Sequence, residues 1–310
     1  IFMNDIRRTI LWVIFGFSMV LLWDQWQVHN GKKATFFPSP AQQVAPAAVG
    51  ASGPLPAASD AGVPAAVAQA GTAMAPVAPV APTAPKERFE VTTDVLKLTF
   101  DTEGGSLVRT EFLKYSDMAD KTRNFVLLDD SKDRVYMAQT GVIAGAAGGA
   151  FPTHKTPMAV TGERVLKDGA NELVVKFTSP DVGGIKLVKT YTLRRGAYDA
   201  TVKHELTNTS TAAIAPQLYL QLVRDGNKPA GESSFYSTFT GPAVYTEAKK
   251  YQKAEFSDIK KKNVDVEKQA SNGYIAMVQH YFASAWILPD GMQRNLSLDA
   301  VDIGASVPDC

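Results

Sequence analysis

The stretch YDATVKHEL, residues 198–206, alternates apolar and polar side chains with a period of two. Its two predicted faces carry Tyr198, Ala200, Val202, His204 and Leu206 on one side, and Asp199, Thr201, Lys203 and Glu205 on the other. A period of two is typical of a β-strand with one face against a core and the other in water. The stretch therefore predicts a half-buried strand.

The same alternation recurs on both sides of this strand. Apolar residues alternate in segments 96–100, 108–112, 173–177, 185–193 and 218–222, and turn-forming residues lie at 101–105 and 180–184. These short segments have no long stretch of helical period between them, so crossover helices are missing. The pattern favours a mainly β fold, an antiparallel β-sandwich, over parallel βαβ units.

Two glycine-rich stretches have ordinary structural interpretations. Gly104 and Gly105 could cradle an anion, but a turn that needs positive φ also explains them. Residues 141–150 lack the GK[ST] ending of a phosphate-binding loop, so we expect a flexible surface loop there.

Near the N-terminus, residues 9–23 form an unbroken apolar run, TILWVIFGFSMVLLW. The run is shorter than a usual membrane span, and its flanks extend it: Arg7 and Arg8 can snorkel, while Trp12, Trp23 and Trp26 suit the membrane interface. We expect a transmembrane anchor over residues 9–28. A cleaved signal peptide is the alternative, although no small-residue cleavage site follows closely.

The charges beside this run indicate its orientation. Arg7 and Arg8 abut the apolar residues, whereas Lys32 and Lys33 lie farther away, so residues 1–8 are expected in the cytoplasm and the rest outside. Residues 29–87 are rich in Ala and Pro, with prolines three apart near the end, which predicts a disordered linker that is stiff beside the folded domain. A docking site for a proline-reading partner is the alternative. The folded domain is predicted over residues 88–310.

Overall composition excludes several functional classes. The formal net charge of +1 implies no nucleic-acid partner, and Cys310, as the single cysteine, excludes an intrachain disulfide and a cysteine-based metal site. The four histidines (His29, His154, His204 and His280) do not have metal-ligand spacing. We therefore predict no catalytic, metal or cofactor site. Met3 is the expected start, and the end at Cys310 suggests a piece of a longer protein.

Two polar features are candidate sites. His204 could be a buried base, but no motif pairs it with a carboxylate or nucleophile, so a hydrogen-bonded core histidine is the simpler interpretation. Segment 248–263 is locally basic and could contact anionic lipid headgroups or an acidic partner, or could form a solvated edge. Its lysines are Lys249, Lys250, Lys253, Lys260, Lys261 and Lys262.

Segment 273–289, GYIAMVQHYFASAWILP, has the highest density of large side chains. It predicts a pair of core strands with a bend or polar contact near its middle. The residues singled out in it, as structural or partner-contacting positions, are Gly273, Tyr274, Gln279, His280, Tyr281, Phe282 and Trp286.

Three segments together resemble the YidC family of bacterial membrane protein insertases. They are the N-terminal MNDIRRTILWVIFGFSMVLLWDQW, the pair FTGPAVY and KYQKAEFSDI (residues 239–245 and 250–259), and above all GYIAMVQHYFASAW (residues 273–286). The order of a short tail, an anchor, an Ala/Pro linker and a large β domain is similar as well.

The resemblance implies a periplasmic β-supersandwich, similar in shape to mutarotase-like domains, in a Gram-negative inner-membrane protein. It implies a non-enzymatic insertase or chaperone for nascent membrane proteins, working in the lipid bilayer with or beside the Sec translocon and its accessory subunits. The family's insertion groove belongs to a later helix bundle, which would follow this segment.

A membrane-anchored, periplasmic sugar-binding or sugar-processing domain is the alternative function. It would need a histidine and glutamate, or two carboxylates, in one cleft. The sequence has no motif that joins such residues.

Overall fold

The computed structural model describes residues 62–64, 87–144, 150–229 and 238–301. The predicted anchor residues Arg7, Arg8, Trp12, Trp23 and Trp26 lie outside these ranges, as does most of the predicted linker. In the described ranges, no helix has the length and apolar character needed to cross a membrane.

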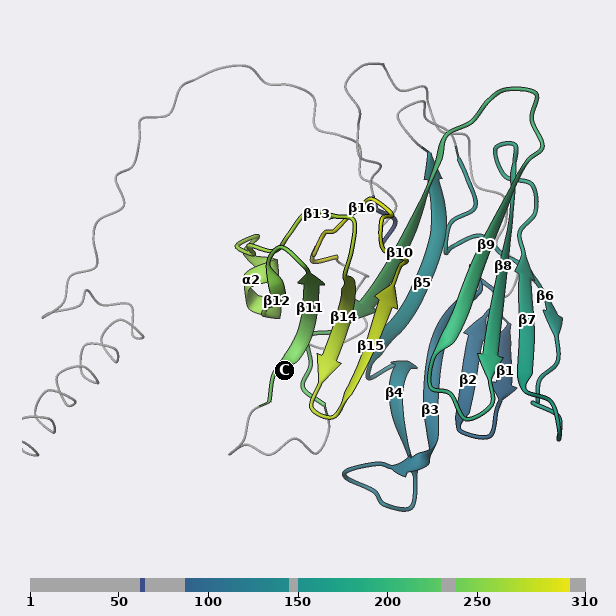
Figure 1. Cartoon of the computed structure of the whole chain (residues 1–310). Coiled ribbons are helices and arrows are strands. Elements are labelled where there is room, and N and C mark those ends of the chain that lie inside the picture. The colour runs from purple at the N-terminus through teal and green to yellow at the C-terminus, as the bar shows by residue number, and fades with distance from the viewer. Residues whose placement is uncertain (1–61, 65–86, 145–149, 230–237, 302–310) are drawn as a thin grey trace, which may run out of the picture. The chain divides into compact units, whose positions relative to one another are not determined.

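The largest sheet has six antiparallel strands in the order β1-β2-β3-β4-β5-β10 (Figure 1). We call it the large sheet. Its strands are β1 (Arg88–Thr92), β2 (Leu96–Asp101), β3 (Ser106–Ser116), β4 (Asn124–Asp130), β5 (Val135–Ala144) and β10 (Pro216–Arg224). The turn predicted at residues 101–105 joins β2 and β3 in a hairpin, in which Gly104 and Gly105 have φ of 72° and 59°.

A second sheet has the order β6-β7-β8-β9, and a third has the order β12-β11-β14-β15. The second sheet contains β6 (Ala159–Gly162), β7 (Glu172–Thr178), β8 (Ile185–Arg194) and β9 (Ala200–Asn208). The third contains β11 (Thr240–Thr246), β12 (Lys250–Lys253), β14 (Tyr274–Gln279) and β15 (Phe282–Ile287). A short pair, β13 (Gln269–Ala270) with β16 (Arg294–Asn295), and the helix α2 (Phe256–Lys260) complete the described elements.

The main core lies between the large sheet and the second sheet. Phe100 of β2 packs against Phe177 of β7 and Tyr191 of β8, with ring centroids 5.4 Å and 4.8 Å apart. The alternation predicted for β7 and β8 is present, because their odd-numbered residues are buried. The interface is therefore a face-to-face packing of two antiparallel sheets.

The third sheet covers another part of the same face of the large sheet. Along β15, Phe282 stacks on Phe125 of β4 at 3.8 Å and Ser284 Oγ lies 2.6 Å from the Tyr136 hydroxyl of β5. Trp286 Nε1 then donates to a β10 carbonyl at 3.0 Å, so β15 crosses β4, β5 and β10 in turn. Tyr136 shares its face of β5 with Thr140, which contacts β9 of the second sheet. The predicted antiparallel β-sandwich is confirmed, with two sheets side by side over one.

Strand β9 departs from its prediction in burial. The strand is present, but Tyr198, just before it, and Leu206 within it are 44 % and 41 % exposed, and Ala200 is exposed as well. Strand β9 is the edge of the second sheet, so it has a strand on one side only. The expectation that this whole face lies against the core was therefore wrong, because only Val202 and His204 on it are half-buried.

The expected loop at 141–150 is wrong at its start. Gly141 and Val142 are buried within β5, paired with β10. A Cβ atom at Gly141 would lie 2.5 Å from the Tyr219 hydroxyl, so the glycine makes room for that ring. Residues 145–149 of the expected loop lie outside the described residues.

Candidate functional site

The aromatic segment 273–289 forms the β14–β15 hairpin of the third sheet. His280 and Tyr281 make its turn, with φ of 40° at His280, and Tyr281 is 78 % exposed. Gln279 is buried at the end of β14. The predicted pair of strands and the bend between them are confirmed, although β15 is half-exposed along its length.

Gly273 begins this hairpin at a point of close backbone approach. Its φ is 83°, and a Cβ atom there would lie 1.9 Å from the carbonyl oxygen of Tyr245 on β11. The next residue, Tyr274, stacks on Tyr245 with centroids 5.4 Å apart. Only glycine fits position 273, because any side chain would separate β11 from β14.

Phe282 joins the hairpin to an aromatic cluster that we call the aromatic junction: Phe112, Tyr115, Phe125, Tyr198 and Phe282. Phe282 lies 5.3 Å from Phe112 and 5.7 Å from Tyr115, and Phe112 lies 5.6 Å from Tyr198. The rings come from the large sheet, the β8–β9 turn and the third sheet. Such ring pairs add about 0.5–1.5 kcal/mol each beyond area burial. The junction therefore ties three sheets together at one place.

Arg294 holds the chain that follows β15. Its guanidinium donates to five backbone carbonyls, those of Ser271, Gly273, Leu288, Pro289 and Met292, at 2.7–3.4 Å. Backbone pairing of β13 with β16 adds to this contact. A planar fork with five donors suits such a cage of carbonyls. The segment after β15 is thus fixed to the start of β14.

A buried polar cluster lies between the large and second sheets. Lys189 of β8 is fully buried, and its Nζ donates to the carbonyl oxygens of Gly104 and Thr140 at 2.5 Å and 2.6 Å. The Tyr191 hydroxyl donates to the Gly105 carbonyl at 2.8 Å, and His204 Nε2 lies 2.8 Å from Thr140 Oγ1. His204 is therefore a hydrogen-bonded histidine, and the glycine turn serves as an acceptor for core side chains.

Burial governs the protonation of this cluster. Desolvation lowers the pKa of Lys189 to about 7, because a charged ammonium is disfavoured away from water. Desolvation, and secondarily the nearby Lys189, lower the pKa of His204 to about 4. Within the described ranges, the hydrogen-bond partners of Lys189 and His204 are carbonyl and hydroxyl oxygens rather than carboxylates, so the cluster does not present a histidine–carboxylate pair.

The other two described histidines of the domain have hydrogen-bond partners of their own. His154 is buried, with Nδ1 2.6 Å from the Tyr219 hydroxyl, and desolvation lowers its pKa to about 4. His280 Nδ1 lies 3.0 Å from Thr238 Oγ1 at the hairpin turn. Among the described residues, no group of three or more histidine, cysteine or acidic side chains is placed to hold a metal ion.

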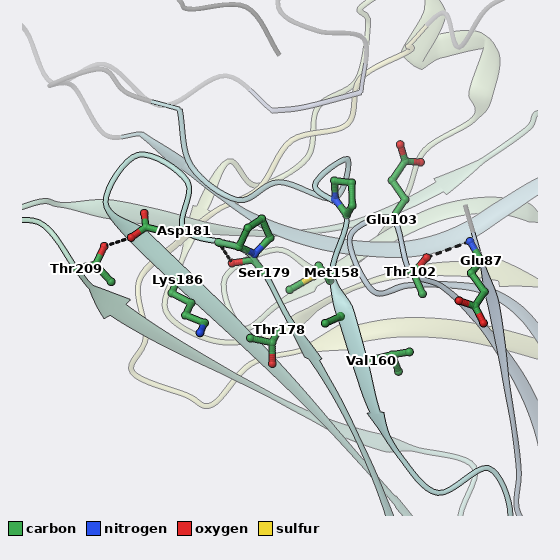
Figure 2. Close-up of a pocket in the computed structure, with 13 residues that line it drawn as sticks. Glu87, Thr102, Glu103, Met158, Val160, Thr178, Ser179, Asp181, Lys186 and Thr209 are labelled. Atoms are coloured by element: carbon green, nitrogen blue, oxygen red, sulfur yellow. Dashed lines mark hydrogen bonds between the residues drawn. The ribbon is translucent and has the colours of Figure 1, made fainter. Parts of the chain in front are cut away.

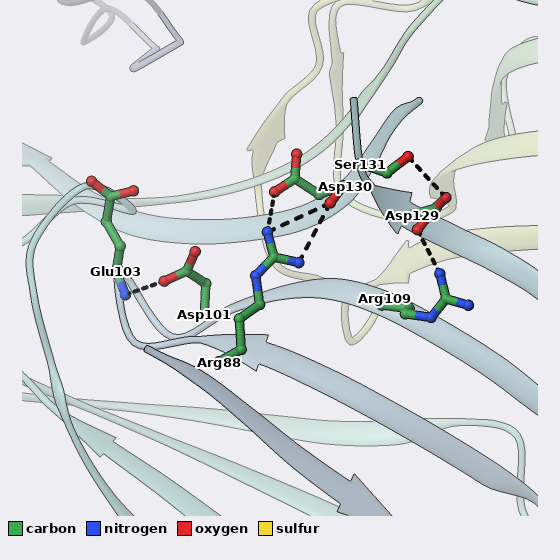
Figure 3. Close-up of polar contacts among 7 residues, drawn as sticks. All are labelled: Arg88, Asp101, Glu103, Arg109, Asp129, Asp130 and Ser131. Carbon is green, nitrogen blue, oxygen red and sulfur yellow. Dashed lines mark hydrogen bonds and ion pairs between the residues drawn. The ribbon is translucent and has the colours of Figure 1, made fainter. Parts of the chain in front are cut away.

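Carboxylates near the start of β1 are held by arginines and backbone. Arg88 binds Asp130 and Arg109 binds Asp129, each at 2.7 Å (Figure 3). Asp101 accepts the backbone N–H of Glu103 at 2.8 Å. A glycosidase needs two carboxyl groups facing one another across a cleft. These carboxylates instead serve strand and turn contacts.

A shallow depression lies beside β6 and the β7–β8 turn (Figure 2). Asp181 accepts a hydrogen bond from Thr209 at one end of it, while Glu87 and Glu103 lie at the other. Met158 and Val160 line the space between them. The acidic groups do not converge on one point, so the depression has no acid–base constellation.

The basic segment 248–263 lies on β12 and α2. Lys249 pairs with Asp265 and Lys250 with Glu247, each at 2.9 Å, and the ammonium of Lys253 lies 4.9 Å from the centre of the Phe239 ring. Lys260, Lys261 and Lys262 are exposed at the end of α2. Part of the segment is therefore a solvated edge with ion pairs, whereas the three lysines at the end of α2 are exposed to solvent.

Comparison with known proteins identifies the family. The family model described as "YidC periplasmic domain" matches residues 88–307. Membrane protein insertase YidC of Bordetella parapertussis is 49 % identical over 297 residues, 95 % of this chain and 52 % of that protein. Those of Bordetella avium (50 % over 298 residues, 95 % and 52 %) and Cupriavidus necator (48 % over 303 residues, 96 % and 52 %) are similar.

The chain spans about half the length of the curated relatives it matches. The match to the family model covers the whole of the β domain from β1 onward, including the aromatic junction, the β14–β15 hairpin and the Arg294 cage. The chain therefore belongs to the YidC family, and residues 88–307 are its periplasmic domain.

Proposed function

We propose that the protein containing this chain is a membrane protein insertase and chaperone that aids the insertion, folding and assembly of integral inner-membrane proteins. The observation that carries the proposal is the family match over residues 88–307 together with relatives named as insertases at 48–50 % identity. Its partners would be the lipid bilayer, nascent membrane proteins, and the Sec translocon with its accessory subunits. Nucleic acid is not among them.

The proposed arrangement follows the sequence. Residues 1–8 would lie in the cytoplasm, residues 9–28 would span the inner membrane, and residues 29–87 would link the span to the periplasmic domain. Arg7, Arg8, Trp12, Trp23 and Trp26 would fix the ends of the span, as snorkelling and interfacial side chains do.

The periplasmic domain would have a structural and binding role rather than a catalytic one. Three observations support this role: each of the three histidines contacts a hydroxyl group, the carboxylates near β1 are held by arginines and backbone, and the motif segment 273–286 packs the third sheet. We assign Gly273, Tyr274, Gln279, His280, Tyr281, Phe282 and Trp286 to that sheet and its exposed turn.

A depletion experiment tests the activity. Cells that depend on the full-length gene are depleted of it, and insertion of a reporter membrane protein is followed by protease protection with and without a plasmid copy. Restored insertion is expected. Normal insertion without the plasmid copy would contradict the proposal.

Cysteine labelling tests the topology independently. In a background with Cys310→Ser, Asn4→Cys should be protected from a membrane-impermeant maleimide, and Ser52→Cys should react in intact cells. Loss of residues 1–28 from the mature protein, measured by intact mass, would favour the cleaved signal peptide instead.

A further inference from the structure

Positive charge is concentrated in one part of the domain. Residues 249–268 contain seven lysines and four carboxylates, a net charge of +3, whereas the whole chain carries +1. The rest of the chain is therefore net negative. This concentration is an exception to an otherwise balanced protein, and it lies on β12, α2 and the segment that follows.

Not all of these lysines are free to meet a partner. Lys249 and Lys250 are in ion pairs and Lys253 lies over an aromatic ring. Lys260, Lys261 and Lys262, which we call the α2 lysine triplet, are exposed, and the described residues supply them with no ion pair. The triplet therefore presents three adjacent charges directly to solvent.

The helix beneath the triplet is held to the domain. Ile259 is buried, and Phe256 packs against the core. Backbone hydrogen bonds from Lys261 to Ser257 and from Lys262 to Ile259 close the helix. The charges are thus displayed on a rigid support, which lowers the entropy lost when they bind.

Lys262 has a backbone conformation that glycine usually adopts, and its side chain gains no packing contact there. Its φ is 55°, in the left-handed region where a helix normally ends on glycine because a side chain is strained there. A lysine at this position provides no packing, since it is exposed. Departures of this kind are expected at functional positions.

We propose that the α2 lysine triplet docks the periplasmic domain onto the anionic lipid headgroups of the membrane. Lysine is a compact, hydrated point charge and suits a diffuse negative surface, whereas specific carboxylate pairing favours the fork of arginine. The inference rests on the proposed function, because it needs the domain to be held beside a bilayer.

Because the domain would be tethered to the membrane, a weak contact is sufficient for docking. Each lysine near an anionic surface raises the binding constant about fivefold, so three lysines raise it about a hundredfold. A flexible linker of the predicted length spans about 40 Å, which keeps the domain at high effective concentration over the membrane. The contact would set the orientation of the domain and would weaken as salt screens it.

The test uses the full-length protein in nanodiscs, with its other cysteines changed to serine and an NBD label on Asn263→Cys, beside the triplet. We expect blue-shifted emission, and quenching by headgroup spin-labelled lipid, in nanodiscs containing phosphatidylglycerol but not in phosphatidylcholine alone. High salt should reverse both signals. Identical signals in the two lipids would overturn the proposal.

Two triple variants distinguish an effect of the α2 lysine triplet from an effect of the domain's overall positive charge. Lys260→Gln, Lys261→Gln, Lys262→Gly should abolish the signal, and its backbone should be no less stable because glycine suits position 262. The control, Lys121→Gln, Lys176→Gln, Lys186→Gln, removes equal charge from exposed sites elsewhere and should keep the signal. Equal loss in both variants would overturn the proposal, as would a response that requires an acidic protein instead of the lipid.

Insertion of a client protein into the same nanodiscs is measured in parallel. A silent probe with normal insertion would overturn the docking inference alone. Failure of insertion by the unmodified protein would count against the proposed function.

Discussion

Lys189 is a lysine with no exposed surface, and its side-chain nitrogen donates to two backbone carbonyls. Burying a charge costs free energy unless partners compensate, and two neutral acceptors compensate only in part. The low pKa of about 7 expresses this cost. The residue therefore links the stability of the domain to pH.

Replacing Lys189 should change the pH dependence of stability. Between pH about 7 and 10.5 the folded protein holds a neutral amine while the unfolded chain stays protonated, so the unfolding free energy rises with pH, by about 1.4 kcal/mol per unit. Lys189→Met should remove this rise. Urea unfolding of the β domain from pH 6 to 10 measures it, and an unchanged slope in the variant would contradict the assignment.

His204 should govern part of the acid sensitivity. Its pKa is about 4 in the folded state against 6.5 ordinarily, so the unfolded chain binds the extra proton between these values and stability falls as pH drops through that window. His204→Gln can keep a hydrogen bond to Thr140 and should lose less stability on acidification. A parallel series with His154→Gln tests the second buried histidine. If neither variant reduces the loss of stability on acidification, burial of these histidines does not cause the acid sensitivity.

At the scale of the element, the β14–β15 hairpin shows why its sequence is so rich in large side chains. Every second residue of β15 contacts a different strand of the large sheet, through a ring, a hydroxyl and an indole N–H. A hairpin alone is marginally stable in water, so this one depends on these contacts and on the pairing of β14 with β11. The turn residue Tyr281 makes no comparable contribution, because it is exposed.

Truncation of the hairpin's inward face should therefore be costly. Phe282→Ala removes a ring that contacts Phe112, Tyr115 and Phe125, and we expect a loss of about 2–4 kcal/mol, below the fully buried range because Phe282 is half-buried. Tyr281→Ser is the matched control and should change stability by less than about 0.5 kcal/mol. Both follow from urea denaturation; equal effects would show that the aromatic junction does not hold the third sheet.

At the scale of the whole domain, three sheets meet at the aromatic junction, and the large and second sheets also meet at the buried polar cluster. Rings from the large sheet, the β8–β9 turn and the third sheet are in contact, and Tyr136 and Thr140 on one face of β5 contact the third and second sheets. Because the second and third sheets each cover part of one face of the large sheet, unfolding of any sheet would expose apolar side chains of the others to water. The described domain should unfold as one unit.

Trp286 offers a direct test of this cooperativity, since it is the only tryptophan after Trp26 and lies in the third sheet. In a chain beginning at Gly62, its fluorescence and far-UV circular dichroism should give coincident unfolding curves. Phe112→Ala, which breaks the junction, should separate them, with the fluorescence change first. An early fluorescence change in the unmodified domain would mean that the third sheet is an independent unit.

The alternation of side chains by itself determined the strands, because a period of two is a local property of the chain. It placed β2, β3, β7, β8, β9 and β10 and the β2–β3 turn correctly, and the resemblance of the hairpin segment identified the family. Lys189 even lay on the core face of that pattern, among Leu187 and Tyr191, although the sequence offered no partner for it.

Only the tertiary structure decided which strands are edges and which side chains meet. The exposure of β9, the burial of Gly141 against Tyr219, the carbonyl partners of Lys189 and the five acceptors of Arg294 all depend on contacts between residues far apart in sequence. Periodicity reports which face of a strand is apolar, whereas the packing of one sheet on another decides how much of that face is covered and by what.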